Sequence, residues 1–430
     1  MRVLPLSLLC AVVLAAAPNS QPTFYKDVLP VLQKNCQNCH RPGEAGPMSF
    51  LDYESTRPWA KAIKSAVITR KMPPWFADPK YGHFENDRTL PAAELETLIS
   101  WVDTGAKAGD PKDAPKPIKF VEGWTIGKPD VVLEMPKPFH IPASGTIDYH
   151  YVILHTNFTE DKYVQFAETR PSDRVHTHHI LSFLREPGSK WLEGAPIGVA
   201  FVPDRNSRGG GASIGDSLGG YGPGTVPDTL RPGQAILVKA GSDLVLQLHY
   251  TADGKESDDA SKVGLIFAKE KPTARLAMLS AMNPRFAIPP NDPNYEVTAK
   301  LTLQRDATLM SLLPHMHLRG KDMRMTATFP DGRVETLLNV PHYNFSWQLS
   351  YYLADPLFLP RGTTIEAIAH FDNSANNPSN PDPSKEVHFG EQSWDEMMFG
   401  FFTVAVAPDV TTMDLMRPPK PQVQATGEDH

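Results

Sequence analysis

The sequence predicts a multidomain protein in which a small all-α domain precedes two all-β sandwich domains. Apolar side chains recur at helical spacing within residues 20–108, as in PAAELETLISWVDTGAKAG, where Pro91 suits a first turn and Gly105 a stop. From Trp124 onward the chain changes to short alternating runs broken by Pro, Gly, Asn and Asp, which are typical of strands. The 42 prolines also favour a loop-rich antiparallel architecture over long helices.

The N-terminus has the layout of a secretory signal. Arg2 precedes an apolar run that ends in small alanines at 15–17, and this run is shorter than the roughly 20 apolar residues that span a bilayer. We therefore expect an exported bacterial protein, periplasmic or extracellular, with no membrane span after signal removal. The expected order is a signal peptide (1–18), the helical domain (19–110), a stiff Pro/Lys-rich linker (111–122), the two sandwiches (123–286 and 287–416) and a disordered tail (417–430).

Composition excludes some partners and one source of stability. The formal net charge is −7 and no long Lys/Arg run is present, which argues against nucleic acid or an anionic membrane surface as a partner. Once Cys10 leaves with the signal, the mature chain keeps only Cys36 and Cys39. A disulfide scaffold is therefore excluded, and stability must come from packed cores.

The two remaining cysteines belong to the pentapeptide CQNCH at 36–40, which could be a redox dithiol, a zinc site or a haem attachment site. Thioredoxin-like chemistry would not need His40. A zinc site would need another pair of ligands, and this segment has only His83 in reserve. The pattern therefore predicts one covalently attached c-type haem, with His40 as an iron ligand.

The second axial ligand is expected to be Met72 in KMPPW, because a thioether raises the haem potential and two prolines stiffen the loop; Met48 or His83 could compete. With CQNCH, KMPPW and WVDTGAKAGD, residues 24–108 resemble a small bacterial cytochrome c domain of the kind fused to other redox modules. The resemblance implies single-electron transfer.

Six histidines of the β region stand out: His176, His178 and His179 form one cluster, His315 and His317 form another, and His249 lies alone in LVLQLHYTADG. Residues i and i+2 of a strand share a face, so His315 and His317 can close on one ion. His176 and His178 share a strand face in the same way, whereas His178 and His179 face opposite sides unless a bulge intervenes. Spacing alone does not decide which of these two pairs binds a metal ion. A thioether added to imidazoles prefers Cu(I), and methionines are present in EQSWDEMMFGFF. Isolated histidines, such as His140, are taken as ordinary surface or core residues.

In chain order, THHILSF, LQLHY, HMHLRGK and SWDEMM resemble the copper motifs of the type II, ascorbate-dependent monooxygenases, the family of peptidylglycine α-hydroxylating and dopamine β-monooxygenase. The similarity covers residues 124–415. It implies two jelly-roll-like sandwiches, each with one copper ion, facing across a solvent-filled cleft. By the resemblance, His178, His179 and His249 form the electron-transfer site, and His315, His317 and Met397 form the oxygen-binding, catalytic site. His176 is then either a residue that supports the ligands without binding the metal or a spare ligand, and Met398 is a weaker candidate than Met397.

Some positions depart from this family. The peptide-hydroxylating members have an arginine where this chain has Leu313, and polar residues where it has Phe399 and Phe401. The expected activity is therefore C–H hydroxylation of a small, apolar or aromatic molecule with O2, using ascorbate, a redox protein or the fused haem as electron donor. Alternatives are a non-hydroxylating haem/copper electron-transfer protein, a zinc sandwich, and electron flow from copper to haem.

Overall fold

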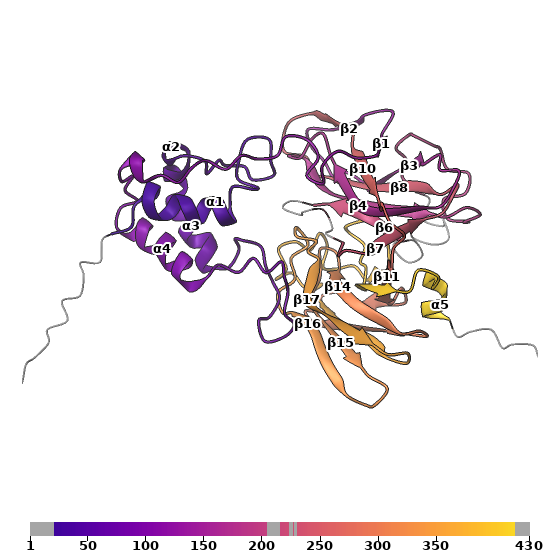
Figure 1. The fold of residues 1–430 in the computed structure, drawn as a ribbon. Coiled ribbons are helices and arrows are strands. Elements are labelled where there is room, and N and C mark those ends of the chain that lie inside the picture. The colour runs from indigo at the N-terminus through magenta and orange to yellow at the C-terminus, as the bar shows by residue number, and fades with distance from the viewer. Residues whose placement is uncertain (1–20, 204–215, 223–226, 228–229, 418–430) are drawn as a thin grey trace, which may run out of the picture.

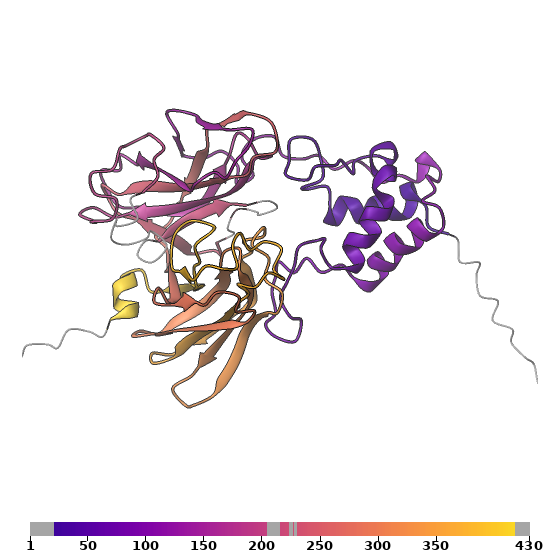
Figure 2. The same ribbon diagram turned by 180° about the vertical axis from the view of Figure 1, so that it is seen from behind.

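The computed structural model describes residues 21–203, 216–222, 227 and 230–417. Two layered β units lie side by side, and a helical N-terminal unit sits to one side of both (Figures 1 and 2). The expected export signal and nearly all of the expected tail lie outside the described residues. Within the described part of the chain, no helix has the length and apolar character needed to cross a bilayer.

The N-terminal unit contains short helices joined by irregular segments. Its α-helices are α1 (Leu29–Asn35), α2 (Tyr53–Thr56), α3 (Ala60–Ile68) and α4 (Ala92–Asp103), with a π-helical turn η1 (Phe24–Val28) and 3₁₀ turns η2 (Arg57–Trp59) and η3 (Pro111–Asp113). Pro91 caps the start of α4, and the chain leaves this helix through Gly105 at φ 98°. Buried Leu98 and Trp101 hold α4 against the small core of the unit.

The expected fold class was wrong in its N-terminal part, because the described chain is mostly β-sheet and has no large all-α domain. The longest helix has 12 residues, and residues 36–52 and 69–91 contain no α-helix. Local chemistry explains the short helices: CQNCHRPGEAGP and KMPPW interrupt helical periodicity with prolines and glycines, which break a helix interior. The β part is compatible with the expected sandwiches.

The strands of the first β unit are β1 (Val131–Glu134), β2 (Phe139–Ile141), β3 (His150–His155), β4 (Lys162–Arg170), β5 (Thr177–Arg185), β6 (Ser217–Tyr221), β7 (Gln234–Val238), β8 (Asp243–Tyr250), β9 (Ser257–Asp259) and β10 (Lys262–Phe267). Strands β3-β8-β5-β6 form one layer and β1-β10-β4-β7 the other, with an apolar core between them. Along β8, Leu244, Leu246 and Leu248 face this core, so Gln247 and His249 face the opposite side.

The second β unit contains β11 (Ala274–Met282), β12 (Ala287–Ile288), β13 (Tyr295–Thr302), β14 (Ala307–His315), β15 (Gly320–Thr328), β16 (Val334–Val340), β17 (Tyr351–Leu359), β18 (Thr364–Phe371), β19 (Val387–His388) and β20 (Phe399–Val406), followed by helix α5 (Thr412–Met416). Strands β13-β18-β15-β16 face β11-β20-β14-β17 across a second core. Strand β7 pairs with β11 in parallel, so one eight-stranded sheet runs through both units.

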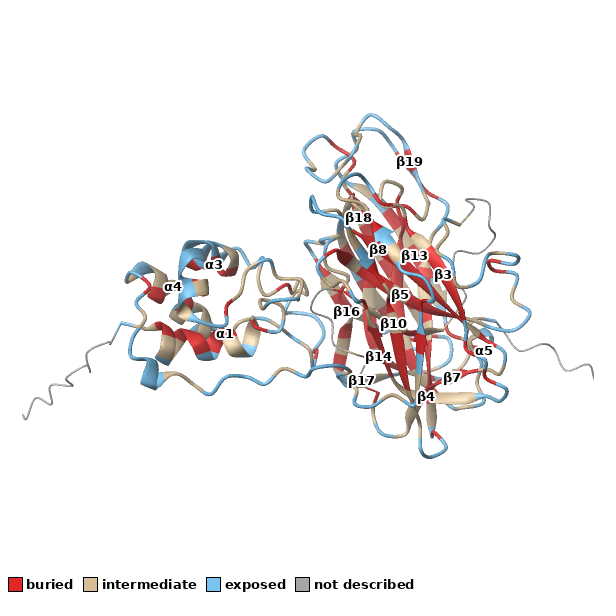
Figure 3. Cartoon of the chain, turned by 90° about the horizontal axis from the view of Figure 1, so that it is seen from above, coloured by how far each residue is buried: buried red, intermediate tan, exposed pale blue. Residues whose placement is uncertain are grey.

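Both β units hold the N-terminal unit. The backbone of residues 83–85 pairs with β17, where Ala354 donates to His83 and Glu85 donates to Tyr352. On the first unit, Arg174 donates two hydrogen bonds to Glu44, at 2.7 and 2.9 Å. Figure 3 shows that the buried residues concentrate in the strands, whereas the helices keep exposed faces.

Candidate metal centres

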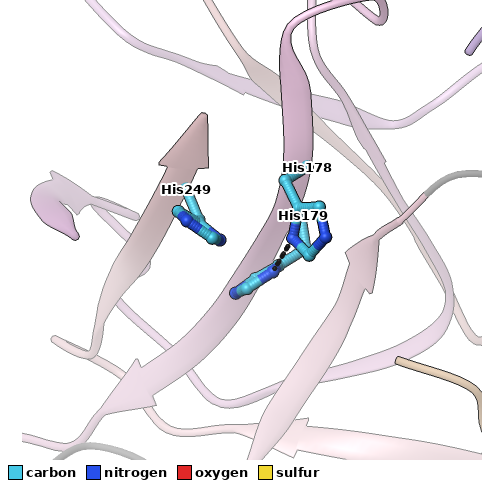
Figure 4. Close-up of side chains that lie close together, drawn as sticks. All are labelled: His178, His179 and His249. Carbon is cyan, nitrogen blue, oxygen red and sulfur yellow. Dashed lines mark hydrogen bonds between the residues drawn. The ribbon is translucent and has the colours of Figure 1, made fainter. Parts of the chain in front are cut away.

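Three histidines meet on the outer face of the β5–β8 ladder. Each offers a ring nitrogen, and the three nitrogens lie within 4.8 Å of one another, as drawn in Figure 4. The ladder register shifts between Thr177 and His179, so β5 carries an extra residue here, and His179 pairs directly with His249. This bulge lets the adjacent His178 and His179 point toward one ion, which an unbroken strand would prevent.

His179 and His249 are buried and His178 is half-buried, and all three rings are neutral imidazoles. Burial lowers the pKa of His178 to about 4, and burial with the neighbouring histidines lowers the pKa of His179 and His249 well below the usual value. His179 Nε2 and His249 Nδ1 are buried and have no hydrogen-bond partner in the described part of the chain. Neutral imidazoles with orphaned nitrogens fit a metal ion, which would satisfy atoms whose burial is otherwise costly.

His176, which its spacing allowed as a metal ligand, instead contacts two carboxylates. Its Nδ1 lies 2.5 Å from an Asp173 oxygen and its Nε2 lies 2.8 Å from an Asp253 oxygen. Although burial alone would lower its pKa, the two carboxylates raise it. Both ring nitrogens are therefore engaged, and His176 bridges the start of β5 to the loop after β8.

The second pair of histidines lies at the end of β14. The ring centroids of His315 and His317 are 5.3 Å apart. The Nδ1 atom of His315 lies 2.8 Å from Gln348 Oε1, and that of His317 lies 3.3 Å from the Asp395 carbonyl oxygen. Each ring is thus oriented through Nδ1, which leaves Nε2 for a metal. His317 Nε2 is buried with no partner in the described residues, and burial lowers the pKa of His317 to about 3.

The two methionines of the DEMM segment face different environments. Met397 is buried beside Phe399 and Phe401 and lines the same cavity as His315. Met398 points the other way, into the core of the second sandwich. The two orientations place Met397, rather than Met398, on the side of the histidine pair.

A buried carboxylate ties the His-x-His segment to the methionine segment. Glu396 is fully buried and accepts hydrogen bonds from the backbone N–H groups of His317 (2.8 Å) and Arg319 (2.6 Å). Arg319 in turn donates to the Trp394 carbonyl at 2.9 Å. Burial raises the pKa of Glu396 to about 8, although these bonds and the Arg319 charge lower it.

Two aromatic residues lie between the two sets of histidines. The Tyr149 ring centroid is 4.3 Å from that of His249 and 6.1 Å from that of His317. The ring centroid of Phe345 lies 5.4 Å from that of His178 and 5.9 Å from that of His317. Each of these two rings therefore packs against histidines of both sets.

A cavity of about 410 Å³ opens between the outer face of β5–β8 and that of β11, β14 and β20. His179 from the first set lines it, together with His315 and Met397 from the second. Most of its wall is apolar, with side chains such as Leu181, Phe183, Met278, Leu313, Phe399 and Phe401. The cavity therefore offers both metal-binding sets to one small molecule of apolar character.

The CQNCH segment forms the turn that follows α1. The backbone N–H groups of Cys39 and His40 both donate to the Cys36 carbonyl, so both thiols belong to one turn, and they are not joined in a disulfide. Burial raises the pKa of Cys36 to about 12, and Cys36 caps the C-terminal, electronegative end of α1. This environment disfavours a reactive thiolate, unlike that of a redox dithiol.

The ring of His40 is held by two neighbours from the segment that follows it. Its Nδ1 lies 3.3 Å from the Met48 carbonyl oxygen, and its ring stacks on Phe50 at 4.4 Å. The other ring nitrogen, Nε2, is then the one left for a metal. Of the candidate second ligands, His83 lies at the surface beside Asp355. Met72 is half-buried and makes no contact with His40 among those described, so its role stays a prediction.

Sequence reasoning missed several residues that shape these sites. Tyr149 and Phe345 lie in segments with no motif of their own. Gln348 is a lone amide far from either histidine pair along the chain, and only the DEM triplet itself hinted at Glu396. A buried acid beside a candidate ligand is a usable signal, because an isolated carboxylate is rarely buried without a partner.

The comparisons with known proteins add no identification. No family model matches the chain, and no curated protein matches it. Among solved structures, the chain is similar to the STIV major capsid protein at 11% identity, with 65% of this chain and 95% of that chain covered and a TM-score of 0.26. The mavirus major capsid protein is 7% identical, with 67% of this chain and 89% of that chain covered and a TM-score of 0.20. Allantoicase is 9% identical, with 55% of this chain and 79% of that chain covered and a TM-score of 0.16. TM-scores this low support no conclusion about function.

Proposed function

We propose that this protein is an exported, copper-dependent monooxygenase that hydroxylates a C–H bond of a small apolar or aromatic molecule with O2. In this proposal His178, His179 and His249 hold one copper ion, and His315, His317 and Met397 hold the other. Cys36 and Cys39 carry a covalent haem whose iron His40 ligates, with Met72 as the expected second axial ligand. Electrons come from ascorbate or a redox protein, directly or by way of the haem.

The observation that supports the proposal most is that two sets of neutral histidines each contribute a ring to one cavity, and that three of their buried ring nitrogens lack partners in the described chain. Imidazole with thioether donors suits copper in both oxidation states, and a copper ion with an open position supplies one-electron chemistry and a binding place for O2. Zinc also accepts imidazole, so the metal itself must be measured.

The residues around the second set orient it and keep water away. Gln348 and the Asp395 carbonyl hold the rings of His315 and His317 through Nδ1. Leu313, Phe399 and Phe401 cover the cavity wall next to His315. This part of the wall is apolar, so it favours an apolar or aromatic group beside His315, although Arg88 and Arg231 also belong to the cavity lining.

The decisive experiment uses the full-length holoprotein with its metals counted. The protein is reduced without oxygen, then given ¹⁸O₂ and a panel of aromatic and aliphatic compounds, and the products are identified by mass spectrometry. We expect two copper ions, one haem, and one ¹⁸O atom incorporated into product for each O2 consumed. The variant His140→Ala, which changes an exposed histidine, serves as the matched control.

Two results would overturn the proposal. Zinc in place of copper would leave a structural metal sandwich. Copper and haem that exchange electrons, but consume O2 without an oxygenated product, would leave a haem/copper electron-transfer protein.

A further inference from the structure

Three acidic side chains line the cavity, and Glu391 differs from the other two in its ion pairing. Glu85 pairs with Arg231 at 3.6 Å, and Asp216 pairs with Arg275 at 3.4 Å. Glu391 also lines the cavity, but among the described residues it has no cationic partner. Its one hydrogen bond there is accepted from the Tyr151 hydroxyl at 3.2 Å.

Glu391 is the open end of a short hydrogen-bonded chain. Gln247 donates through Nε2 to the Tyr151 hydroxyl at 2.5 Å, and this hydroxyl donates onward to Glu391 Oε2. The Tyr151 proton is therefore already used. These three side chains can therefore still accept a hydrogen bond from a ligand in the cavity, chiefly at the second carboxylate oxygen of Glu391.

Glu391 is half-buried at the cavity wall. Burial raises the pKa of Glu391, although the bond from Tyr151 lowers it. A ligand that fills the cavity displaces water from this carboxylate, so binding is favoured when the ligand supplies a hydrogen-bond donor in exchange. Apolar side chains, including Phe399 and Phe401 stacked at 4.8 Å, form much of the remaining wall.

We propose that Glu391, held by Tyr151 and Gln247, binds the hydrogen-bond-donating head group of a ligand whose apolar body fills the cavity beside His315 and Met397. The ligand class is thus an apolar or aromatic molecule with one hydroxyl or ammonium group, and Glu391 is its specificity-determining residue. This inference rests on the proposed function in naming the ligand a substrate, but the binding site itself does not require turnover.

The test measures equilibrium binding to the oxidised full-length protein without reductant, so that nothing turns over. The probes are 4-ethylphenol, its methyl ether 4-ethylanisole, and 4-ethylbenzylamine, each titrated by calorimetry. A hydrogen bond to a charged group is worth about 1.5–3 kcal/mol, so a donor should bind about 10- to 100-fold more tightly than the ether. The phenol arm identifies a neutral head group and the amine arm a cationic one.

Variants assign the effect to Glu391. Glu391→Leu should reduce the preference for the donor over the ether to less than about threefold. Glu391→Gln keeps an acceptor oxygen, so it should retain a preference for the phenol and lose one for the amine. Glu386→Gln, an exposed acid of the same segment, is the matched control and should behave as the unaltered protein.

The outcomes separate this inference from the proposed function. Equal binding of both donors and the ether by the unaltered protein overturns it whether or not the variants fold, as does a preference that survives Glu391→Leu. If oxygenated product forms without such discrimination, the monooxygenase proposal stands and this site falls. If the protein prefers the donors to the ether but forms no oxygenated product, the Glu391 site stands and the monooxygenase proposal falls.

Discussion

At the scale of single residues, the adjacent His178 and His179 show how one extra residue in a strand creates a candidate metal site. An unbroken strand sends neighbours to opposite faces. The register shift before His179 turns both rings toward His249, whose ring centroid lies 4.8 Å from that of His178 and 4.9 Å from that of His179. The site therefore depends on three side chains and one bulge.

The first prediction concerns the contribution of one ring. Replacing His249 with Ala removes one of three nitrogens, so copper affinity at this set should fall by more than the 10- to 100-fold that loss of an outer partner costs. Competition with a Cu(I) chelator measures this. His140→Ala should leave the affinity unchanged, and an unaltered affinity in His249→Ala would remove this histidine from the site.

A second prediction follows from the lowered pKa of His317. An unfolded histidine takes up a proton near pH 6.5, whereas folded, metal-free His317 resists protonation until about pH 3. Between these values the unfolded state binds more protons, so the metal-free protein should lose stability as pH falls below 6.5, by about 2 kcal/mol per such histidine at pH 5.

Urea unfolding at pH 7.5 and pH 5 measures this dependence. The variant His317→Gln should show a smaller loss between the two values, because it removes the group that titrates. Equal losses in the two proteins would mean that His317 is protonated as readily when folded as when unfolded.

At the scale of elements, the second histidine pair is assembled by the segment that precedes β20. Glu396 accepts from the backbone of His317 and of Arg319, and Arg319 donates back to Trp394. The strand end that carries the histidines and the segment that carries Met397 are thereby joined at several points. A change in this junction should alter the metal site without touching a ligand.

The third prediction tests this junction. Glu396→Ala leaves two buried N–H groups without acceptors, which costs about 1–3 kcal/mol each. We expect copper affinity at the second set to fall about 10- to 100-fold while the first set keeps its affinity. Glu396→Gln retains one acceptor oxygen and should restore part of the loss. Equal weakening of both sets would indicate general unfolding instead.

At the scale of the whole molecule, the N-terminal unit is held at two places. Trp75 packs on Tyr351 of the second sandwich at 4.8 Å, beside the backbone pairing with β17. On the first sandwich, Glu44 of the segment after CQNCH is bound by Arg174, four residues before His178. The CQNCH turn and the first histidine set are thus connected through the ion pair between Glu44 and Arg174.

The fourth prediction examines this anchor. Arg174→Ala removes a partly buried pair in which one guanidinium nitrogen contacts both oxygens of Glu44, so residues 36–48 should open more often, with hydrogen exchange about tenfold faster. Exchange followed by mass spectrometry localises the effect. Arg333→Ala, which breaks a pair exposed on a hairpin, is the control. Unchanged exchange in Arg174→Ala would show that other contacts hold the unit.

Much of the architecture was predictable from local patterns. Alternating apolar runs after Trp124 predicted a β-rich region, and the CQNCH, His-His and His-x-His spacings selected residues that the fold brings into two clusters and one turn. The all-α expectation failed because periodicity in α1, α3 and α4 was extended across segments whose prolines and glycines end helices.

The sequence by itself determined which side chains have metal-binding chemistry, because ligand type and close spacing are properties of the chain. Only the tertiary structure decided that β5 bulges at His178. It also decided that Asp173 and Asp253 bind both ring nitrogens of His176. Likewise, it placed Tyr149 and Phe345 between the two sets. These features depend on contacts between residues far apart along the chain. Such contacts form only when the sandwiches pack, and local spacing carries no record of them.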